Sequence, residues 1–254
     1  MQKEEQKFLA SDILEGMTSI SALLNSGKEN DRRITRVLID RQKRKSRAAQ
    51  IGFLTAKSHE LGFSVEFVDA DEIAAHTVGN THGGIIAFCT PRTIPALTPD
   101  AIVPNEFYVY LDGIEDPYNF GYAVRSLYAA GVSGIVLPER NWMSASGVVA
   151  RASAGASERI PTYTASPTDA VTLFKAAGYS VLCAGIRDSV SVFDEHFPYP
   201  VLLVVGGEKR GISRALLDSA DRTVRIDYGR TFGGSLSAAS AATVMAFEIF
   251  RQNR

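Results

Sequence analysis

The N-terminal part of the chain alternates between hydrophobic patterns typical of helices and of strands. Apolar residues recur at helical spacing from Ile13 to Leu24 and again from Gln50 to Leu61. Short apolar runs typical of strands lie at Thr35 to Ile39, at Ser64 to Val68 and at residues 83–88, where two glycines open the run. This alternation predicts a small α/β domain.

A proline-rich stretch then predicts a domain boundary. Residues 90–105 contain prolines at 91, 95, 99 and 104, few charges and no periodicity, as is typical of a linker. We expect an N-terminal domain at 1–91, a linker at 92–105 and a second domain at 106–254. The length of 254 residues suits two domains, since domains usually have about 100–200 residues.

After the linker, short apolar strands and helices follow each other in regular alternation. The predicted strands are Phe107 to Leu111, Gly134 to Leu137, Ser180 to Ala184, Val201 to Val205 and Thr223 to Ile226. The predicted helices are Tyr122 to Ala130, Val148 to Arg151, Ala170 to Ala177, Ser213 to Ala220 and Leu236 to Arg251. This order predicts an α/β fold with a parallel sheet covered on both faces. Ligands of such sheets bind beyond the carboxyl ends of the strands, so we expect the site there.

Composition indicates a folded protein and excludes several classes. With 45% apolar and 22% charged residues the chain is not of the disordered type. Cys89 and Cys183 each lie in an apolar run, so their spacing indicates neither a disulfide framework nor a metal site. The polar first residues and the lack of a long apolar run exclude a signal peptide and a membrane span, so we expect a cytoplasmic protein.

Positive charge is concentrated in one segment although the formal net charge is only −1. Residues 28–57 carry ten Lys or Arg against three acidic residues, a local net charge of +7. The densest part directly follows a predicted strand and consists of Arg41, Lys43, Arg44, Lys45 and Arg47. Two interpretations fit this cluster: contacts to the phosphates of a nucleic acid, or a solvated helix face.

Polar residues cluster at the end of the first strand of the second domain. Residues 111–125, LDGIEDPYNFGYAVR, form a strand end, a turn and the start of a helix. If Asn119 lies near the helix start, Arg125 follows within two turns and both side chains can face one pocket. The alternative is an Asn cap with a surface arginine.

Two glycine-rich segments follow later strands. Residues 204–213, VVGGEKRGIS, place Glu208 among glycines that allow a flat ligand to approach the backbone, although the spacing does not fit a Walker A loop. Residues 233–244, GGSLSAASAATV, enter a helix of small residues that another backbone or a ligand could approach closely. A capped turn and a tightly packed core helix are the respective alternatives.

These three segments, in this order, resemble the SpoU (TrmH-like) branch of the SPOUT superfamily of S-adenosylmethionine-dependent RNA methyltransferases. The first is similar to the family pattern D-P-x-N-x-G-x-x-x-R, and the second to G-x-E-x-x-G with Glu208 at its centre. Residues 151–156 with Ile160 and Pro161 are similar to a further family segment. Residues 14–91 resemble the small ribosomal-protein-like domain with which many members hold RNA, which favours the phosphate interpretation of the basic cluster.

The resemblance implies a trefoil-knotted α/β domain that works as a homodimer, with the site completed across the interface. It implies methyl transfer from S-adenosylmethionine to a ribose 2′-hydroxyl of structured RNA, ribosomal rather than transfer RNA, and not to DNA, which lacks this hydroxyl. The implied catalytic residues are Arg125, Asn119, Glu208, Ser235 and Ser237. The implied cofactor site comprises Cys183, Ala184, Gly185, Gly206, Ile226 and Leu236. Arginine is almost always protonated, so Arg125 either acts as a base in an unusual pocket or orients the hydroxyl.

The third segment departs from the family pattern. The family usually has Ser-Leu-Asn-Val-Ser where this chain has SLSAA at residues 235–239, so that Ser237 replaces the asparagine. An alternative function is therefore an RNA-binding protein that keeps the fold but is catalytically impaired.

Overall fold

A computed structural model describes residues 12–27, 30–77, 80–139, 145–207 and 211–254 of the chain. The chain forms two compact units, one of residues 1–93 and 141–159, the other of residues 94–140 and 160–254. The division differs from the sequence-based boundaries at the expected linker and at residues 141–159. Residues 141–159 were expected in the second domain, but they pack with the N-terminal unit.

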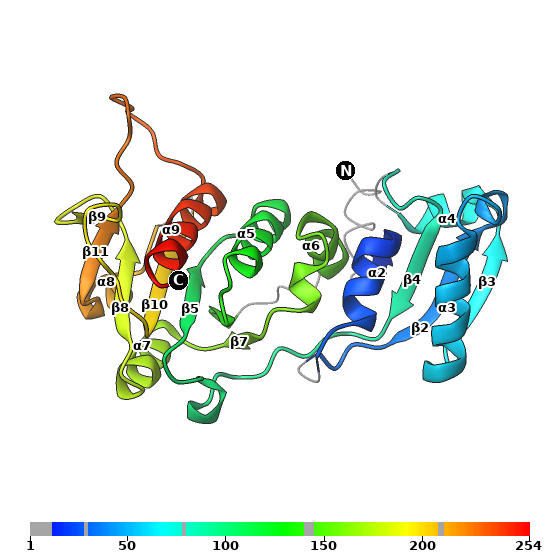
Figure 1. Cartoon of the computed structure of the whole chain (residues 1–254), viewed down its shortest axis with the longest axis horizontal. Helices are drawn as coiled ribbons and strands as arrows, with labels where there is room; N and C mark the ends of the chain where they lie inside the picture. Colours follow the sequence, from blue (N-terminus) through cyan, green and yellow to red (C-terminus); the bar gives the residue numbers. More distant parts are fainter. Residues whose placement is uncertain (1–11, 28–29, 78–79, 140–144, 208–210) are drawn as a thin grey trace. The chain divides into compact units, whose positions relative to one another are not determined.

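The N-terminal unit contains a mixed four-stranded sheet in the order β1-β4-β2-β3 (Figure 1). Its strands are β1 (Ile13–Glu15), β2 (Ile34–Asp40), β3 (Ser64–Val68) and β4 (Ile85–Cys89). Strand β4 runs antiparallel to both of its neighbours, whereas β2 and β3 are parallel.

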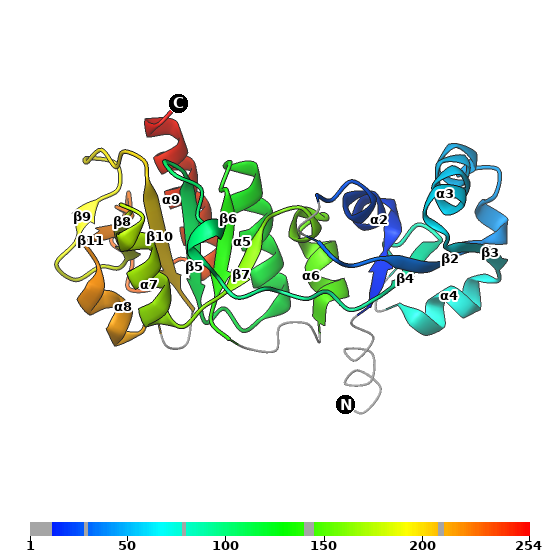
Figure 2. The same ribbon diagram turned by 90° about the horizontal axis from the view of Figure 1, so that it is seen from below.

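Helices cover both faces of this sheet. Successive residues of β2 point to opposite sides, so its apolar residues contribute to a core on each face. Val37 and Ile39 pack into the core beneath helices α2 (Gly16–Leu24) and α3 (Ala48–Leu61). Leu38 between them joins the core on the other face, beneath α4 (Ala70–His76). Figure 2 shows α2 and α3 on one side of the sheet and α4 on the other.

The segment at 145–159 adds α6 (Ser146–Ala152) and a 3₁₀ turn (Ala156–Glu158) to this unit. Ala150 of α6 is fully buried in the core formed with α2 and α3. Asn30 Nδ2 donates a hydrogen bond to the Glu158 carbonyl oxygen at 3.0 Å. Residues far apart in the sequence thus share one core.

The second unit is built on a seven-stranded sheet in the order β7-β6-β5-β10-β8-β11-β9. Every pairing between its described strands is parallel. The strands are β5 (Phe107–Asp112), β6 (Gly134–Leu137), β7 (Thr162–Thr164), β8 (Ser180–Ala184), β9 (Val190–Ser191), β10 (Val201–Gly206) and β11 (Arg222–Arg225). The predicted parallel α/β sheet is therefore confirmed.

Helices pack on both faces of this sheet as well. Phe174 of α7 (Pro167–Ala176) and Leu216 of α8 (Arg214–Ser219) share a core with Tyr108 and Tyr110 of β5. On the other face, α5 (Pro117–Ala129) packs against α9 (Ala238–Gln252) (Figure 2). Among the described residues, no helix is long and apolar enough to cross a membrane.

Several elements differ from the sequence predictions. The helix expected from Ile13 begins only at Gly16, whose φ of +79° separates it from β1. Helix α5 begins at Pro117 rather than Tyr122, because Asp116 caps it by accepting a hydrogen bond from Asn119 N at 2.8 Å. Helix α4 and strands β7 and β9 were not predicted.

Part of the expected linker is built into the second unit. Leu97 and Ile102 are buried in its core, and Ala96 forms a parallel bridge with Thr164 of β7. Pro99 begins a short 3₁₀ helix, Pro99–Ala101, so the expected linker is neither fully irregular nor without contacts.

Candidate active site

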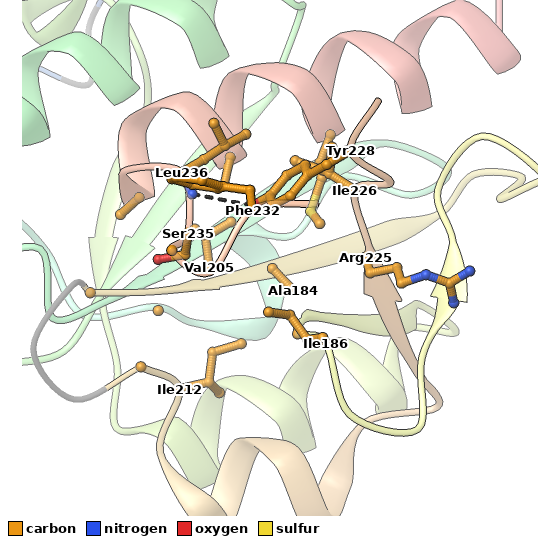
Figure 3. Close-up of a pocket in the computed structure, with 18 residues that line it drawn as sticks. Ala184, Ile186, Val205, Ile212, Arg225, Ile226, Tyr228, Phe232, Ser235 and Leu236 are labelled. Atoms are coloured by element: carbon orange, nitrogen blue, oxygen red, sulfur yellow. Dashed lines mark hydrogen bonds between the residues drawn. The ribbon is translucent and has the colours of Figure 1, made fainter. Parts of the chain in front are cut away.

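The carboxyl ends of β8, β10 and β11 converge on a cavity of about 470 Å³ (Figure 3). Ala184 to Ile186 follow β8, Val205 to Gly207 end β10, and Arg225 and Ile226 end β11. This is the location expected for the ligand of a parallel sheet.

The segment between β11 and α9 forms another wall of this cavity. Tyr228, Phe232 and residues 234–236 line it, and Leu236 N donates a hydrogen bond to Tyr228 Oη at 3.2 Å. The rings of Tyr228 and Phe232 meet edge to face at 5.9 Å. Figure 3 shows both rings and Leu236 on the side of the cavity opposite Ile212. The lining is thus mostly backbone and apolar side chain.

Glycines at the end of β10 permit very close packing of the backbone. A Cβ atom at Gly206 would lie 2.3 Å from the Gly211 carbonyl carbon, and one at Gly207 would lie 2.0 Å from the Gly113 oxygen. Such distances require backbone to move, so only glycine fits at either position.

Asp112, at the end of β5, holds the neighbouring turn in place. Its Oδ2 accepts a hydrogen bond from Ser213 N at 2.7 Å, and its carbonyl oxygen accepts one from Gly207 N at 2.8 Å. Sequence reasoning quoted Asp112 within the first segment but assigned it no role. The position of this acidic residue directly at the end of a predicted strand could have indicated a role at the site.

Five of the predicted cofactor residues line the cavity, namely Ala184, Gly185, Gly206, Ile226 and Leu236. Cys183 does not, because it points to the opposite face of β8, where its thiol donates to the Leu216 carbonyl oxygen at 3.7 Å. Burial raises the pKa of this thiol to about 12. Ile186, Tyr228, Phe232 and Met245 also line the cavity and were not predicted.

The predicted catalytic residues fall into different places. Ser235 lines the cavity. Ser237 instead caps α9, since its Oγ accepts from Ser240 N at 3.2 Å. Asn119 and the exposed Arg125 lie on α5 and are not among the residues lining the cavity. Glu208 lies outside the described residues.

The basic cluster directly follows β2, as expected from the sequence. Arg41, Lys43, Arg44 and Lys45 are exposed and Arg47 is half-buried. Arg41 Nε lies 3.0 Å from Asp69 Oδ1, and the Arg44 guanidinium lies 5.1 Å from the centre of the Phe67 ring. Within the described part of the chain, no group of acidic, histidine and cysteine side chains could hold a metal ion.

Two family models match the two parts of the chain. Residues 13–95 match the RNA 2′-O ribose methyltransferase substrate-binding domain, and residues 106–247 match the SpoU rRNA Methylase family. The chain belongs to the SpoU rRNA methylase family. The predicted family and the α/β fold with a substrate-binding domain are confirmed. The two descriptions, of an rRNA methylase and of RNA 2′-O ribose methyltransferase substrate binding, agree with the chemistry expected from the resemblance.

Relatives and solved structures agree with this membership. A 23S rRNA (guanosine-2′-O-)-methyltransferase of Blochmanniella floridana is 25% identical, with 96% of each chain covered. A protein assigned to the TrmH family of tRNA/rRNA methyltransferases in Staphylococcus haemolyticus is 33% identical over 57% of this chain and 58% of its own length. The chain thus spans little more than half of that relative. The AdoMet-bound rRNA methyltransferase of Sinorhizobium meliloti superposes with a TM-score of 0.77 at 25% identity, covering 97% of this chain and 94% of that one.

Proposed function

We propose that this chain transfers a methyl group from S-adenosylmethionine to a ribose 2′-hydroxyl of structured RNA, with ribosomal RNA as the substrate. The observation that carries the proposal is the cavity at the ends of β8, β10 and β11, which lies within the part that matches the methylase family. The 23S rRNA specificity of the Blochmanniella relative supports the choice of RNA.

The cavity suits the proposed cofactor. Its volume of about 470 Å³ lies within the range of about 300–1,000 Å³ typical of small-molecule sites. Glycines 185, 206 and 207 contribute backbone to the cavity lining, and Ile226, Leu236 and Met245 offer apolar contacts to an adenosine. S-adenosylmethionine supplies an electrophilic methyl group on its sulfonium when it is bound.

The protein must then hold the ribose 2′-hydroxyl, a weak nucleophile, in line with that methyl group and accept the proton of the hydroxyl. Useful alignment requires reacting atoms about 3–3.5 Å apart. We assign Arg125 to orient the ribose hydroxyl and stabilise the developing alkoxide, or to take its proton when the pocket permits. Ser235, on the cavity wall, positions the ribose, and Asn119 and Glu208 position Arg125.

A homodimer would bring Arg125 to the cavity. Arg125 is exposed on α5, one turn after Tyr122, whose exposed fraction is 51%. On α9, which packs against α5, Phe247 and Phe250 are 43% and 37% exposed. Apolar side chains gathered on one pair of helices are typical of an interface. We infer that two chains pair through α5 and α9, so that Arg125 of one chain completes the cavity of the other.

The oligomeric state tests this pairing directly. Phe247→Glu should convert a dimer to a monomer in light scattering after gel filtration. Val103→Glu is the matched control, because Val103 is 50% exposed and lies outside both helices. A wild-type monomer, or a Phe247→Glu dimer, would remove the interface from the proposal. The trefoil knot implied by the resemblance and the cytoplasmic location expected from the sequence remain predictions.

Transfer of labelled methyl from S-adenosylmethionine to ribosomal RNA, transfer RNA and DNA tests the function. We expect transfer to ribosomal RNA, loss of transfer in Arg125→Ala, and full activity in Arg214→Ala, a control whose side chain is 86% exposed on α8. Persistent transfer by Arg125→Ala would exclude Arg125 from the mechanism. Cofactor binding without transfer to any RNA would instead support the catalytically impaired alternative.

A further inference from the structure

A second cavity, of about 320 Å³, lies within the N-terminal unit. Its walls come from the start of α2, the end of the basic cluster and the turn before β4, and α6 adds Arg151. The polar side chains lining it include Arg47, Gln50, His82 and Arg151. It is separate in sequence from the cavity in the methylase part, and its size reaches the lower end of small-molecule sites, about 300 Å³.

Hydrogen-bond donors and acceptors line this cavity. His82 Nδ1 accepts from Gly84 N at 3.1 Å, so a neutral His82 carries its proton on Nε2, where it can donate. Gln50 Oε1 lies 3.4 Å from Arg47 Nη1, and its amide offers both donors and an acceptor. A Cβ atom at Gly83 would lie 2.8 Å from Arg47 Nη2, so the guanidinium lies directly against glycine backbone.

The charge of the cavity is positive. Glu15 Oε2 pairs with Arg151 Nη1 at 2.7 Å, which holds Arg151 at the wall and offsets its charge. Among the described residues, no carboxylate forms an ion pair with Arg47. The exposed cationic residues of the basic cluster directly precede Arg47 in the sequence, and a Cβ atom at Gly84, next to Gly83 of the cavity, would lie 2.8 Å from Lys43 Cγ.

We infer that this cavity binds one unpaired nucleotide of the RNA substrate, with a phosphate on Arg47 and the base edge on Gln50 and His82. Proteins recognise RNA sequence mainly through splayed-out bases that stack on arginine or aromatic planes and bond through their edges. The cavity offers such planes, an amide and glycine backbone beside a basic surface. This inference rests on the proposed function, because it names the RNA element that the substrate-binding domain holds.

Arg151 connects the proposed nucleotide site with the methylase part, because it lines the cavity and lies in a segment between two strands of the parallel sheet. Arg151 and Ala154 line the cavity and belong to the segment that connects β6 with β7. A nucleotide in the cavity therefore contacts a segment whose two ends continue into the parallel sheet. RNA lacking the recognised nucleotide should bind more weakly as a result of losing these contacts.

Affinity measurements on the full chain with a fluorescent single-stranded oligoribonucleotide test the inference. Gln50→Glu keeps the side-chain shape but places a negative charge in the cavity, and we expect affinity to fall about tenfold. Gln42→Glu is the matched control, since it adds the same charge to the basic cluster outside the cavity. Gln50→Ala should weaken binding without changing its salt dependence, because it removes a base contact and no phosphate contact.

Equal affinities of Gln50→Glu and Gln42→Glu would overturn the inference. Adenosine, guanosine, cytidine and uridine monophosphates are tested in parallel. Binding of one of them without any binding of RNA would also overturn the inference, because the cavity would then be the site of a free nucleotide. Photo-crosslinking of thiouridine-substituted RNA should label residues 15–19 or 81–83, and labelling confined to 41–45 would contradict the assignment.

Methyl transfer separates this inference from the proposed function. If the wild type methylates RNA and Gln50→Glu does so with unchanged KM, the nucleotide site is excluded and the enzyme stands. If no RNA accepts methyl but Gln50→Glu still loses RNA affinity, the enzyme is excluded and the nucleotide site stands. Cofactor affinity should be the same in all of these variants.

Discussion

Arg32 and Glu158 form a buried ion pair in the N-terminal unit, with Arg32 Nη1 3.2 Å from Glu158 Oε1 and side-chain exposures of 0% and 2%. Ser146 Oγ accepts from Arg32 Nη2 at 2.5 Å, and Asn30 Nδ2 donates to Glu158 Oε2 at 2.9 Å. Both charges are therefore hydrogen-bonded as well as paired. The pair joins the segment before β2 to the segment at 145–159.

Breaking this ion pair should strongly lower the free energy of unfolding. Glu158→Leu removes the nearer of the two carboxylates that pair with Arg32 at 3.2 and 3.4 Å while the guanidinium stays buried, and we expect a loss of about 3–5 kcal/mol in the free energy of unfolding. Urea denaturation followed by circular dichroism measures the loss. Glu66→Gln is the control, because its pair with Arg36 at 3.8 Å is exposed and should contribute less than about 1 kcal/mol. Equal losses in the two variants would show that burial of the pair does not matter.

The end of β10 should tolerate no side chain. Gly206→Ala places a Cβ atom 2.5 Å from Ile212 N, so the turn after β10 must shift and the cavity with it. We expect calorimetry to show at least a tenfold loss of S-adenosylmethionine affinity, while circular dichroism confirms the fold. Gly233→Ala is the matched control, since nothing lies within 4 Å of its added atom. Unchanged affinity in Gly206→Ala would place the cofactor elsewhere.

Strands flanked by clear turn signals could be predicted to the residue. Ser64–Val68, Gly134–Leu137 and Ser180–Ala184 have the expected bounds. The three-residue strand β1 was missed because its apolar residues run on into the helical spacing of α2, and only the φ of Gly16 separates the two. The membership of residues 141–159 depends on long-range contacts such as the Arg32–Glu158 pair, which no local pattern reveals.

The site was predictable to the extent that topology determines it. Because parallel strands end at one edge, the turns at Gly185, Gly206 and Ile226 had to converge. Sequence patterns gave no sign that Tyr228 and Phe232 would form a wall, because the segment after β11 has no periodicity. The roles of Arg125 and Asn119 stay predictions, since α5 holds them away from the cavity lining of their own chain.

Ser237 has a structural role that can be separated from catalysis. Its hydroxyl caps α9, so Ser237→Ala should lower the free energy of unfolding by about 1 kcal/mol. Ser237→Asn should keep the stability, since asparagine is an equally good cap. Turnover of Ser237→Asn then reports on substrate positioning alone. Lower stability of Ser237→Asn than of Ser237→Ala would contradict the capping role.

Because two thiols are buried, we expect the free energy of unfolding to fall at alkaline pH. Burial raises the pKa of Cys89 and Cys183 from 9.0 to about 12, so the unfolded chain releases these protons at lower pH than the folded chain. The contribution of the two protonated thiols to the free energy of unfolding is therefore complete below pH 9 and is lost as pH rises towards about 12. Urea denaturation across this range should show a shallower decline in a Cys89→Ala, Cys183→Ala double variant. Parallel declines would show that other groups control the alkaline limit.

A mixed dimer tests whether Arg125 acts on the cavity of the other chain. In a heterodimer of Arg125→Ala and Gly206→Ala chains, one site combines the intact cavity of the first with the intact Arg125 of the second. The other site carries both substitutions. At an S-adenosylmethionine concentration that fills the wild-type cavity but not that of Gly206→Ala, we expect each homodimer to show little methyl transfer. The co-expressed, doubly tagged heterodimer should recover about half of the wild-type rate, since one of two sites is complete. An inactive heterodimer that binds S-adenosylmethionine and RNA would place Arg125 and the cavity in the same chain.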